Sequence, residues 1–425
     1  MVLKPLNTGK LIPGMFCWRL LQKNFFWIPT HFPFSILFII LYRLLQHAKN
    51  SHVKEPPKHP KIYHQTMKKP LYILFALFLL SCSRETDSQF NLDDLQVYAP
   101  ELMVSIDTVD DTFFGHIGYS SIVLDNGNVL IPDRQHVKIF IVDGEGNTVG
   151  SVLSEGKGPR EIGDVSFITK SEHNGALVYD QYNKKIVIID GDGQYKDEFI
   201  APNHNLGGNI SLSWVFETAQ DQFLFVYRSF QYFRDRDAEQ LSYLVTYNRE
   251  TGLFGEPVTI RSIPYGIHDN GAGGRITPFA SGDLFSFSDE TSSLYLYWSG
   301  ANTIAQMNTE LDTTQVINFT IEPERITNQE LDSLRSEFPE YWTSMRSFLT
   351  DNKAYADQMM VDHKDNIWLR LNHKHEQQQW LMVSGSGELL GIVLLPKEAM
   401  LTHISADHLG VRLDDGTFAL FEPVF

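Results

Sequence analysis

The stretch LIPDRQHVKIFIVDGEGNTVGSV (residues 130–152) returns 47 residues later, without a gap, as LVYDQYNKKIVIIDGDGQYKDEF (residues 177–199). The two copies share, among other pairs, Asp133/Asp180, Lys138/Lys185 and Gly146/Gly193. Each copy contains apolar strand-like segments joined by a glycine turn, which is the pattern of β-hairpins. A β-type unit that recurs every 40 to 50 residues or so indicates a propeller, because one unit cannot bury its apolar face alone.

Further units of the same kind follow along the chain. The hairpin SIVLDNGNVLIPD (121–133) precedes the first copy, and the glycine turn recurs at SGSG (384–387). We expect the remaining blades at 223–258, 283–307, 358–396 and 402–425. The last of these is short of strands, and segment 96–109 would complete it from the other end of the chain. The sequence therefore predicts an all-β, six-bladed propeller that closes without exposed sheet edges.

One segment, residues 325–353, breaks the β pattern. Thr327 and Glu330 form a capping box, and Leu331, Leu334 and Phe338 follow at helical spacing. We predict a short helical insertion between the fourth and fifth blades. Its aromatic residues either pack on the ring or cover one mouth of the channel, and the sequence leaves both interpretations open.

Charge and cysteine content exclude several classes of protein. The chain of 425 residues has a net charge of −17, but residues 1–82 carry +10 and the remainder carries −27. A body this acidic repels phosphate backbones, so we expect no nucleic-acid partner. The only cysteines, Cys17 and Cys82, precede the body, which therefore has no disulfide framework or thiolate metal site.

The segment MKKPLYILFALFLLSCS (67–83) has the parts of a secretory signal: a basic start, an apolar run of ten residues and a small residue before Cys82. Its end, LLSC, resembles a bacterial lipobox, which implies cleavage before Cys82 and lipid attachment to that residue. Residues 83–95 are polar and would form a tether. We expect a lipid-anchored envelope protein in the outer membrane that faces the periplasm or the cell surface. The lipid on Cys82 would attach it to the membrane.

Residues 1–66 stand upstream of this complete signal. They are basic and contain one apolar run, FSILFIILY (34–42), which could be a weak membrane segment. We favour a translation start at Met67, with 1–66 as a non-native extension. The expected organisation is then an extension (1–66), a signal peptide with lipobox (67–82), a tether (83–95) and the propeller (96–425).

The chain resembles bacterial lipoproteins of the six-bladed β-propeller type, which are related in form to NHL-repeat and TolB-like propellers. The resemblance covers residues 67–425 and is carried by short motifs. They are SCS at Cys82, IDTVDDTFFG (106–115), EGKGPREIG (155–163), GGRITPF (273–279), ITNQELDSL (326–334), DNIWLR (365–370) and GELLGIVLLP (387–396). It implies the fold and says almost nothing about activity.

Candidate sites are few. The turns DGEG and DGDG lack the ligand order of an EF-hand and are read as hairpin turns, and the pair His373 and His375 has no identifiable third metal ligand. Asp133 and Asp180 are interpreted as structural residues at strand ends. Arginine and aromatic side chains that would line a funnel for acidic or sugar ligands are Arg228, Arg275, Trp368 and Arg370. Arg160 is a further candidate ligand-binding residue.

No catalytic motif was found: the chain has no G-x-S-x-G, no H-E-x-x-H and no P-loop. The function we predict is recognition of a glycan, peptide or protein partner, without a cofactor. The alternative is a propeller enzyme of the lyase or lactonase type with a divalent metal on the central axis. Function should lie where the repeat is broken, at 229–241, 266–279 and 325–353.

Overall fold

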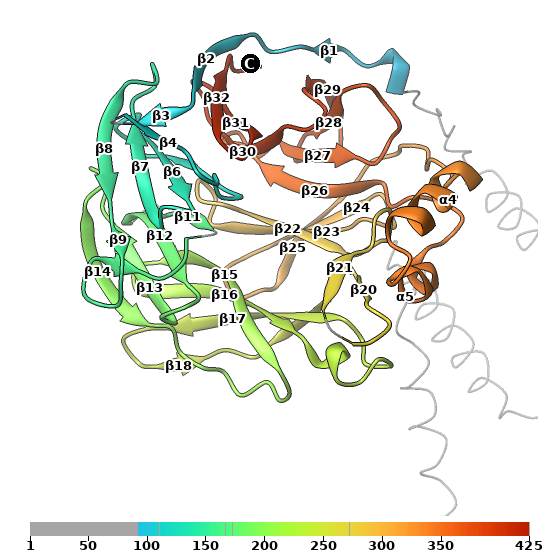
Figure 1. Cartoon of the computed structure of the whole chain (residues 1–425), viewed down its shortest axis with the longest axis horizontal. Helices are drawn as coiled ribbons and strands as arrows, with labels where there is room; N and C mark the ends of the chain where they lie inside the picture. The colour runs from blue at the N-terminus through green and yellow to red at the C-terminus, as the bar shows by residue number, and fades with distance from the viewer. Residues whose placement is uncertain (1–91, 110, 166, 172, 272, 425) are drawn as a thin grey trace, which may run out of the picture. The chain divides into compact units, whose positions relative to one another are not determined.

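Six largely antiparallel sheets, four of them with four strands and two with five, are arranged as the blades of one ring in the computed structural model of the chain (Figure 1). The structure describes residues 92–109, 111–165, 167–171, 173–271 and 273–424. The expected extension, signal peptide, Cys82 and most of the tether lie outside these residues. Among the described helices, none is long and apolar enough to cross a membrane.

In the first five blades the four strands follow one another in sequence, with the first strand nearest the ring axis (Figure 1). The first blade is β5 (Ile122–Val123), β6 (Val129–Asp133), β7 (Lys138–Val142) and β8 (Thr148–Val152). The second is β11 (Ile168–Ser171), β12 (Gly175–Asp180), β13 (Lys185–Ile189) and β14 (Tyr195–Ile200). The third is β15 (Ile210–Ala219), β16 (Gln222–Ser229), β17 (Leu241–Asn248) and β18 (Leu253–Phe254), with β19 (Val258–Arg261) also paired to β17.

The second half of the ring has the same organisation. The fourth blade is β22 (Asp283–Ser288), β23 (Ser293–Trp298), β24 (Thr303–Met307) and β25 (Thr313–Asn318). The fifth is β26 (Ala356–Val361), β27 (Ile367–Leu371), β28 (Gln378–Val383) and β29 (Leu389–Leu395). The sixth is β30 (Met400–Ile404), β31 (Leu409–Asp414), β32 (Thr417–Phe421) and, from the other end of the chain, β2 (Leu102–Ile106). The six-bladed fold predicted from the repeat is confirmed.

Closure of the ring divides segment 96–109 between two blades. Strand β2 pairs antiparallel with β32, as expected, and places Ile106 in the core between the sixth and first blades. The preceding strand β1 (Val97–Tyr98) pairs in parallel with β29 of the fifth blade instead. The prediction that the whole segment completes the last blade is therefore corrected: only 102–106 do so.

Short elements outside the blades are β3 (Thr108–Val109) with β4 (Thr112–Phe113), β9 (Ser154–Glu155) with β10 (Glu161–Ile162), β20 (Tyr265–Ile267) with β21 (Gly274–Ile276), and the 3-10 turns η1 (Leu92–Asp94) and η2 (Gln231–Phe233). The predicted helical insertion is confirmed as α4 (Asn328–Glu337) and α5 (Trp342–Phe348). Thr327 and Glu330 form the capping box reciprocally, at 2.9 and 3.2 Å.

Topology places all three breaks in the repeat on one face of the ring. In an antiparallel blade, the start of the first strand and the end of the second strand lie at the same end. Connections that lead into first strands and turns between second and third strands therefore share a face. We call it the insertion face; it carries 114–121, 134–137, 229–241, 262–282 and 319–355.

Asp133 and Asp180 hold equivalent turns on this face, and both side chains are fully buried. Asp133 accepts hydrogen bonds from the amides of Gly115 (2.7 Å), Gln135 (2.9 Å) and His136 (3.0 Å). Asp180 repeats this with the amides of Gly163, Tyr182 and Asn183, at 2.8, 3.1 and 3.0 Å. Each carboxylate thus fixes a strand end to the segment that leads into its blade, and the structural interpretation of both residues is confirmed.

Substitution Asp133→Asn tests this role through pH. Burial by itself would raise the pKa of the Asp133 carboxyl, but hydrogen bonds from His136 and the Gly115 amide outweigh it and lower the pKa. A lowered pKa means that the ionised carboxylate stabilises the fold above the ordinary aspartate pKa of about 3.9 and that this is lost as the pH falls through the lowered pKa. We expect the variant to lose about 2 kcal/mol at pH 7.

Urea unfolding of the wild-type protein and of Asp133→Asn, at pH 7 and at pH 3, measures the difference between their free energies of unfolding. The difference should be smaller at pH 3, below the ordinary aspartate pKa of about 3.9, because Asp133 of the unfolded wild-type chain then binds a proton that must be released on folding. A difference of the same size at both pH values would contradict the role of the charge.

Candidate functional site

The three breaks in the repeat pack against one another as one structure, the insertion cluster, which comprises the described residues of 229–241, 266–279 and 325–353. Arg236 Nη2 donates to the carbonyl of Asp269 at 2.6 Å, and the amide of Asp269 donates to the carbonyl of Glu340 at 2.9 Å. The amide of Ile267 donates to Ser344 Oγ at 3.0 Å. Figure 1 shows α5 beside β20, which agrees with these bonds.

An apolar interior joins the helical part of the cluster to the connection before β22. The core of the helical part consists of Ala280, Leu334 and Leu349, with Phe279, Ile326, Leu331, Phe338, Trp342 and Phe348 packed on it. The aromatic residues of the helices thus pack on one another and on residues 279–280 of the connection before β22.

Lys353 holds the start of α4 through ion pairs with Glu324 and Glu330. Its ammonium lies 2.6 Å from Glu324 Oε1 and 2.7 Å from Glu330 Oε1, and the side chain is 2% exposed. Burial tends to raise the pKa of Glu330, but the hydrogen bond from Lys353 and those from Thr327 outweigh it and lower the pKa. The capping box is therefore joined to the connection that leads into β26.

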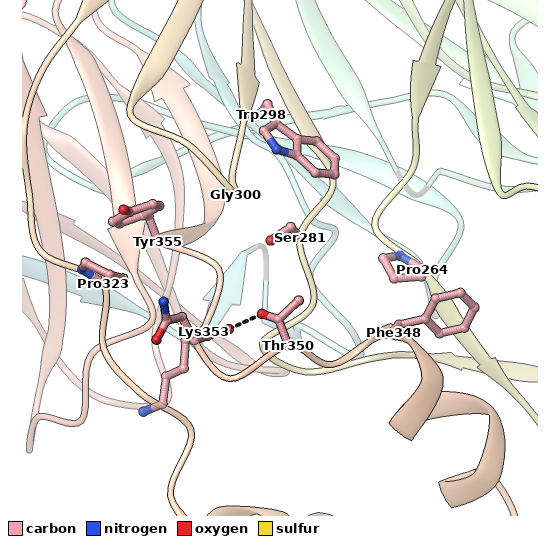
Figure 2. Close-up of a pocket in the computed structure, with 10 residues that line it drawn as sticks. Pro264, Ser281, Trp298, Gly300, Pro323, Phe348, Thr350, Lys353 and Tyr355 are labelled. Atoms are coloured by element: carbon pink, nitrogen blue, oxygen red, sulfur yellow. Dashed lines mark hydrogen bonds between the residues drawn. The ribbon is translucent and has the colours of Figure 1, made fainter.

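A cavity of about 360 Å³ opens between this connection and the fourth blade (Figure 2). Its wall is part aromatic or proline and part small and polar. The lining residues are Pro264, Ser281, Trp298, Gly300, Pro323, Phe348, Thr350, Asn352, Lys353 and Tyr355. We call it the Trp298 pocket. Figure 2 shows Trp298, Tyr355 and Phe348 on three different sides of it.

The indole of Trp298 is held in place from outside the pocket. The guanidinium of Arg261, which does not line the cavity, lies 4.9 Å from the indole centroid. The backbone amide of Arg261 donates to Asp283 Oδ2 at 2.5 Å, and Asp283 is the cross-strand partner of Trp298. A Cβ at Gly300 would come within 2.7 Å of Trp298 Nε1, so glycine at this position leaves the indole its space.

The pocket carries no free charge among its lining residues. Lys353 is the only ionisable group there besides the Tyr355 phenol, and its ammonium is bound to Glu324 and Glu330. Burial raises the pKa of Tyr355, so the phenol stays protonated. Three aromatic rings with hydroxyl and amide groups between them suit a neutral ligand that has apolar faces and hydrogen-bonding edges.

The structure does not bring the five candidate ligand-binding side chains together in one site. Arg160 is exposed, with φ of 63°, and its guanidinium lies 5.3 Å from the Tyr195 ring centroid. Arg228 donates to the carbonyl of Ile263 at 2.9 Å and stacks on Tyr265 at 4.2 Å. It therefore ties the third blade to the connection before β20.

The other three lie on separate elements. Arg275 of β21 is exposed and rests on Phe338 of the insertion cluster at 5.2 Å. Arg370 of β27 forms a two-pronged ion pair with Asp357, at 2.6 and 2.8 Å. Trp368 is fully buried in the core between the fifth and sixth blades, and its Nε1 donates to Asp362 at 3.0 Å. The expectation that Trp368 offers its ring to a ligand is corrected, because packing and this hydrogen bond use the whole side chain.

A divalent metal on the central axis would need several carboxylate or imidazole ligands that converge on one point. Across the described part of the chain, no group of three or more His, Cys, Asp or Glu side chains is placed to hold a metal ion. Glu217 of β15, which is 5% exposed, accepts hydrogen bonds from Ser171 and Asn174. The DGDG turn is a hairpin in which Asp190 accepts from the amides of Asp192 and Gln194. The arrangement of the described carboxylate and histidine side chains does not fit the metal of the lyase or lactonase alternative.

Sequence reasoning missed Trp298, Gly300, Ser281 and Tyr355. Trp298 and Gly300 stand in the segment YLYWSGAN (295–302), where a strand meets the turn on the insertion face. The position of Trp298 and Gly300 at the end of a blade strand could therefore have identified them as candidate site residues. Nothing in the sequence indicated that Tyr355 lies beside them, because that residue is more than fifty positions away and follows two helices.

Comparison with known proteins agrees with the fold. Residues 89–256 match the model of a family described as a 6-bladed beta-propeller, DUF5128. No curated protein matches the chain.

Solved structures of similar fold include a member of the duf4221 family from Bacteroides vulgatus, at 10% identity and a TM-score of 0.48, with 78% of this chain and 98% of that chain covered. A putative exported protein from Bacteroides fragilis has 14% identity and a TM-score of 0.44, over 76% of this chain and 98% of that one. A gluconolactonase from Xanthomonas campestris has 12% identity and a TM-score of 0.41, over 76% and 95%.

Proposed function

We propose that the protein is a lipid-anchored recognition module of the cell envelope that binds a neutral glycan or a peptide segment in the Trp298 pocket. The observation that carries the proposal is the indole of Trp298, which is held by Arg261 and borders a cavity of about 360 Å³. That volume is within the range of small-ligand sites, about 300 to 1,000 Å³. A protein partner would present such a segment.

The surroundings of the pocket support binding without chemistry. The lining offers Ser281, Thr350 and Asn352 as hydrogen-bonding residues, while its ammonium is neutralised by two carboxylates. An apolar sugar or side-chain face would pack against Trp298, and polar edges would meet these groups. Since hydrogen bonds and an apolar core join the parts of the insertion cluster to one another, the pocket is preorganised, which lowers the entropic cost of binding.

Substitution Trp298→Ala tests the site. An array of neutral oligosaccharides and a tripeptide library would first identify a ligand for the full-length protein. We expect the variant to bind that ligand at least tenfold more weakly, since a buried aromatic contact at the centre of a site commonly contributes more than about 1.4 kcal/mol.

Tyr182→Ala is the matched control, because Tyr182 is an aromatic residue on the insertion face that is 69% exposed and does not line the pocket. Its affinity should stay at the wild-type value. Undiminished binding by Trp298→Ala would place the ligand elsewhere.

The envelope location rests on the sequence MKKPLYILFALFLLSC (67–82). Several acyl chains on one cysteine anchor a protein firmly, because each buried CH₂ adds about 0.8 kcal/mol. In bacteria, we expect the wild-type protein in the membrane fraction and labelled by a radioactive fatty acid. Cys82→Ala should lose the label and leave the outer membrane fraction, whereas equal labelling of both proteins would contradict lipid attachment at Cys82.

A further inference from the structure

Six aromatic residues form a continuous row along the inner strands and their approaches on one side of the ring. We call Tyr119, Phe167, Trp214, Phe216, Phe285 and Phe287 the aromatic row. Ring centroids are 5.5 Å apart for Tyr119 and Phe167 and 4.1 Å apart for Phe167 and Trp214. The row continues from Trp214 to Phe216 at 6.2 Å and from Phe216 to Phe287 at 5.4 Å. It therefore crosses the first four blades.

Strand periodicity explains why these rings gather there. Trp214 and Phe216 are two residues apart on β15 and so share one side of the strand. They pack against the core between the third and fourth blades, and Phe285 of β22 meets Trp214 edge-on from the other side at 6.3 Å. Each of these rings keeps part of its surface exposed.

At the insertion face, the aromatic row ends at Tyr119, whose phenol ring lies beside two guanidinium groups. The Tyr119 side chain is 40% exposed. The guanidinium of Arg134 lies 5.4 Å from its centroid and that of Arg412 lies 5.6 Å away. Arg134 and Arg412 come from the turn of the first blade and from β31 of the sixth, so closure of the ring creates this arrangement.

The two guanidinium groups differ in how far their hydrogen-bonding capacity is used. Arg412 donates to the carbonyl of Ile117 at 2.9 Å and lies 3.6 Å from Asp415. Arg134 donates to Tyr119 Oη at 3.3 Å, and its buried Nε has no hydrogen-bond partner among the described residues. Since Nε is buried, an anion would pair with this guanidinium through its Nη donors.

Nearby carboxylates do not neutralise Arg134. Asp133 is fully buried and is held by backbone amides and by His136 Nδ1 at 3.0 Å. Asp415 faces His116 at 3.4 Å as well as Arg412. Both acids are therefore engaged by other groups.

We propose that this corner is a second binding site, distinct from the Trp298 pocket, for a short anionic sugar. The carboxylate or sulfate of the sugar pairs with Arg134, assisted by Arg412, and the apolar faces of its pyranose rings pack on Tyr119 and along the aromatic row. Because residues 83–425 carry a net charge of −27, long polyanions are repelled and a short ligand with few charges is favoured.

Calorimetry on the purified full-length protein in detergent tests the proposal with three probes: trigalacturonate, a neutral galactose trimer and a sulfated galactose trimer. We expect at least one anionic trimer to bind tenfold or more tightly than the neutral trimer. The tighter of the two anionic probes identifies carboxylate or sulfate as the source of the charge.

Variants locate the site. Arg134→Gln and Tyr119→Ala should each weaken the anionic trimer about tenfold with unchanged melting temperature. Arg160→Gln is the matched control, because the guanidinium of Arg160 also lies over a tyrosine ring, that of Tyr195, at 5.3 Å. This variant should bind the anionic trimer with the wild-type affinity. Trp298→Ala should also keep this binding, which separates failure of this site from failure of the pocket. Equal binding of the neutral trimer, or an equal loss in Arg160→Gln, would overturn the proposal.

Discussion

Removal of residues 1–106 is expected to abolish cooperative folding of the ring, although it takes away no strand that leads a blade. The truncation deletes β2, which supplies the outermost strand of the sixth blade through four residue pairs with β32. Ile106 of β2 is 5% exposed and contributes to a core with Phe418 and Leu420 of the sixth blade. These side chains, which are fully buried in the intact ring, would face water along an open sheet edge.

The expected cost is comparable to the stability of the fold. Loss of Ile106 alone removes about 1.5 to 3 kcal/mol of apolar burial, and uncovering two further large residues roughly doubles this. A total near 5 kcal/mol equals the lower end of typical domain stabilities. Urea unfolding followed by tryptophan fluorescence should show a cooperative transition for the wild-type chain and none for the truncated one.

The matched control is removal of residues 1–91, which leaves η1, β1 and β2 in place. We expect this shorter truncation to unfold cooperatively at the wild-type urea concentration. If the two truncated proteins were equally stable, closure by β2 would not hold the ring together.

Substitution Trp368→Ala is expected to destabilise the ring by about 3 to 5 kcal/mol. The indole is fully buried among residues of the fifth and sixth blades, including Trp380, Leu409 and Val411. It also donates a hydrogen bond to Asp362, whose side chain is 3% exposed and would lose one of its partners. Cavity formation and the lost bond therefore act in the same direction.

Two further variants separate these contributions. Trp368→Phe keeps most of the ring volume and removes the donor, so we expect a loss of about 1 to 2 kcal/mol. Trp298→Ala should cost no more than about 1 kcal/mol, because the indole of Trp298 is partly exposed and lines a cavity. Urea midpoints that rank the three variants in another order would contradict the assignment of Trp368 to the core and Trp298 to the pocket.

Local pattern predicted the blades where the repeat is regular. The turns after Asp143, Asp190 and Ser384 are hairpins, with Gly146, Gly193 and Gly387 at positive φ as such turns require. The capping box at Thr327 placed the start of α4 correctly. Strand β15 (Ile210–Ala219) was missed, because its alternation is broken by two register shifts against β16.

The sequence by itself determined the elements and their order, since hydrophobic periodicity, glycine turns and capping residues act between positions close in the chain. Only the tertiary structure decided which side chains meet. It set Trp298, Ser281 and Tyr355 around one cavity, brought Arg134 and Arg412 to the same tyrosine, and buried Trp368 beyond the reach of a ligand. Those outcomes depend on how the blades turn about the axis and on how the ring closes, and contacts between residues up to nearly 300 positions apart leave no periodic trace in a single sequence.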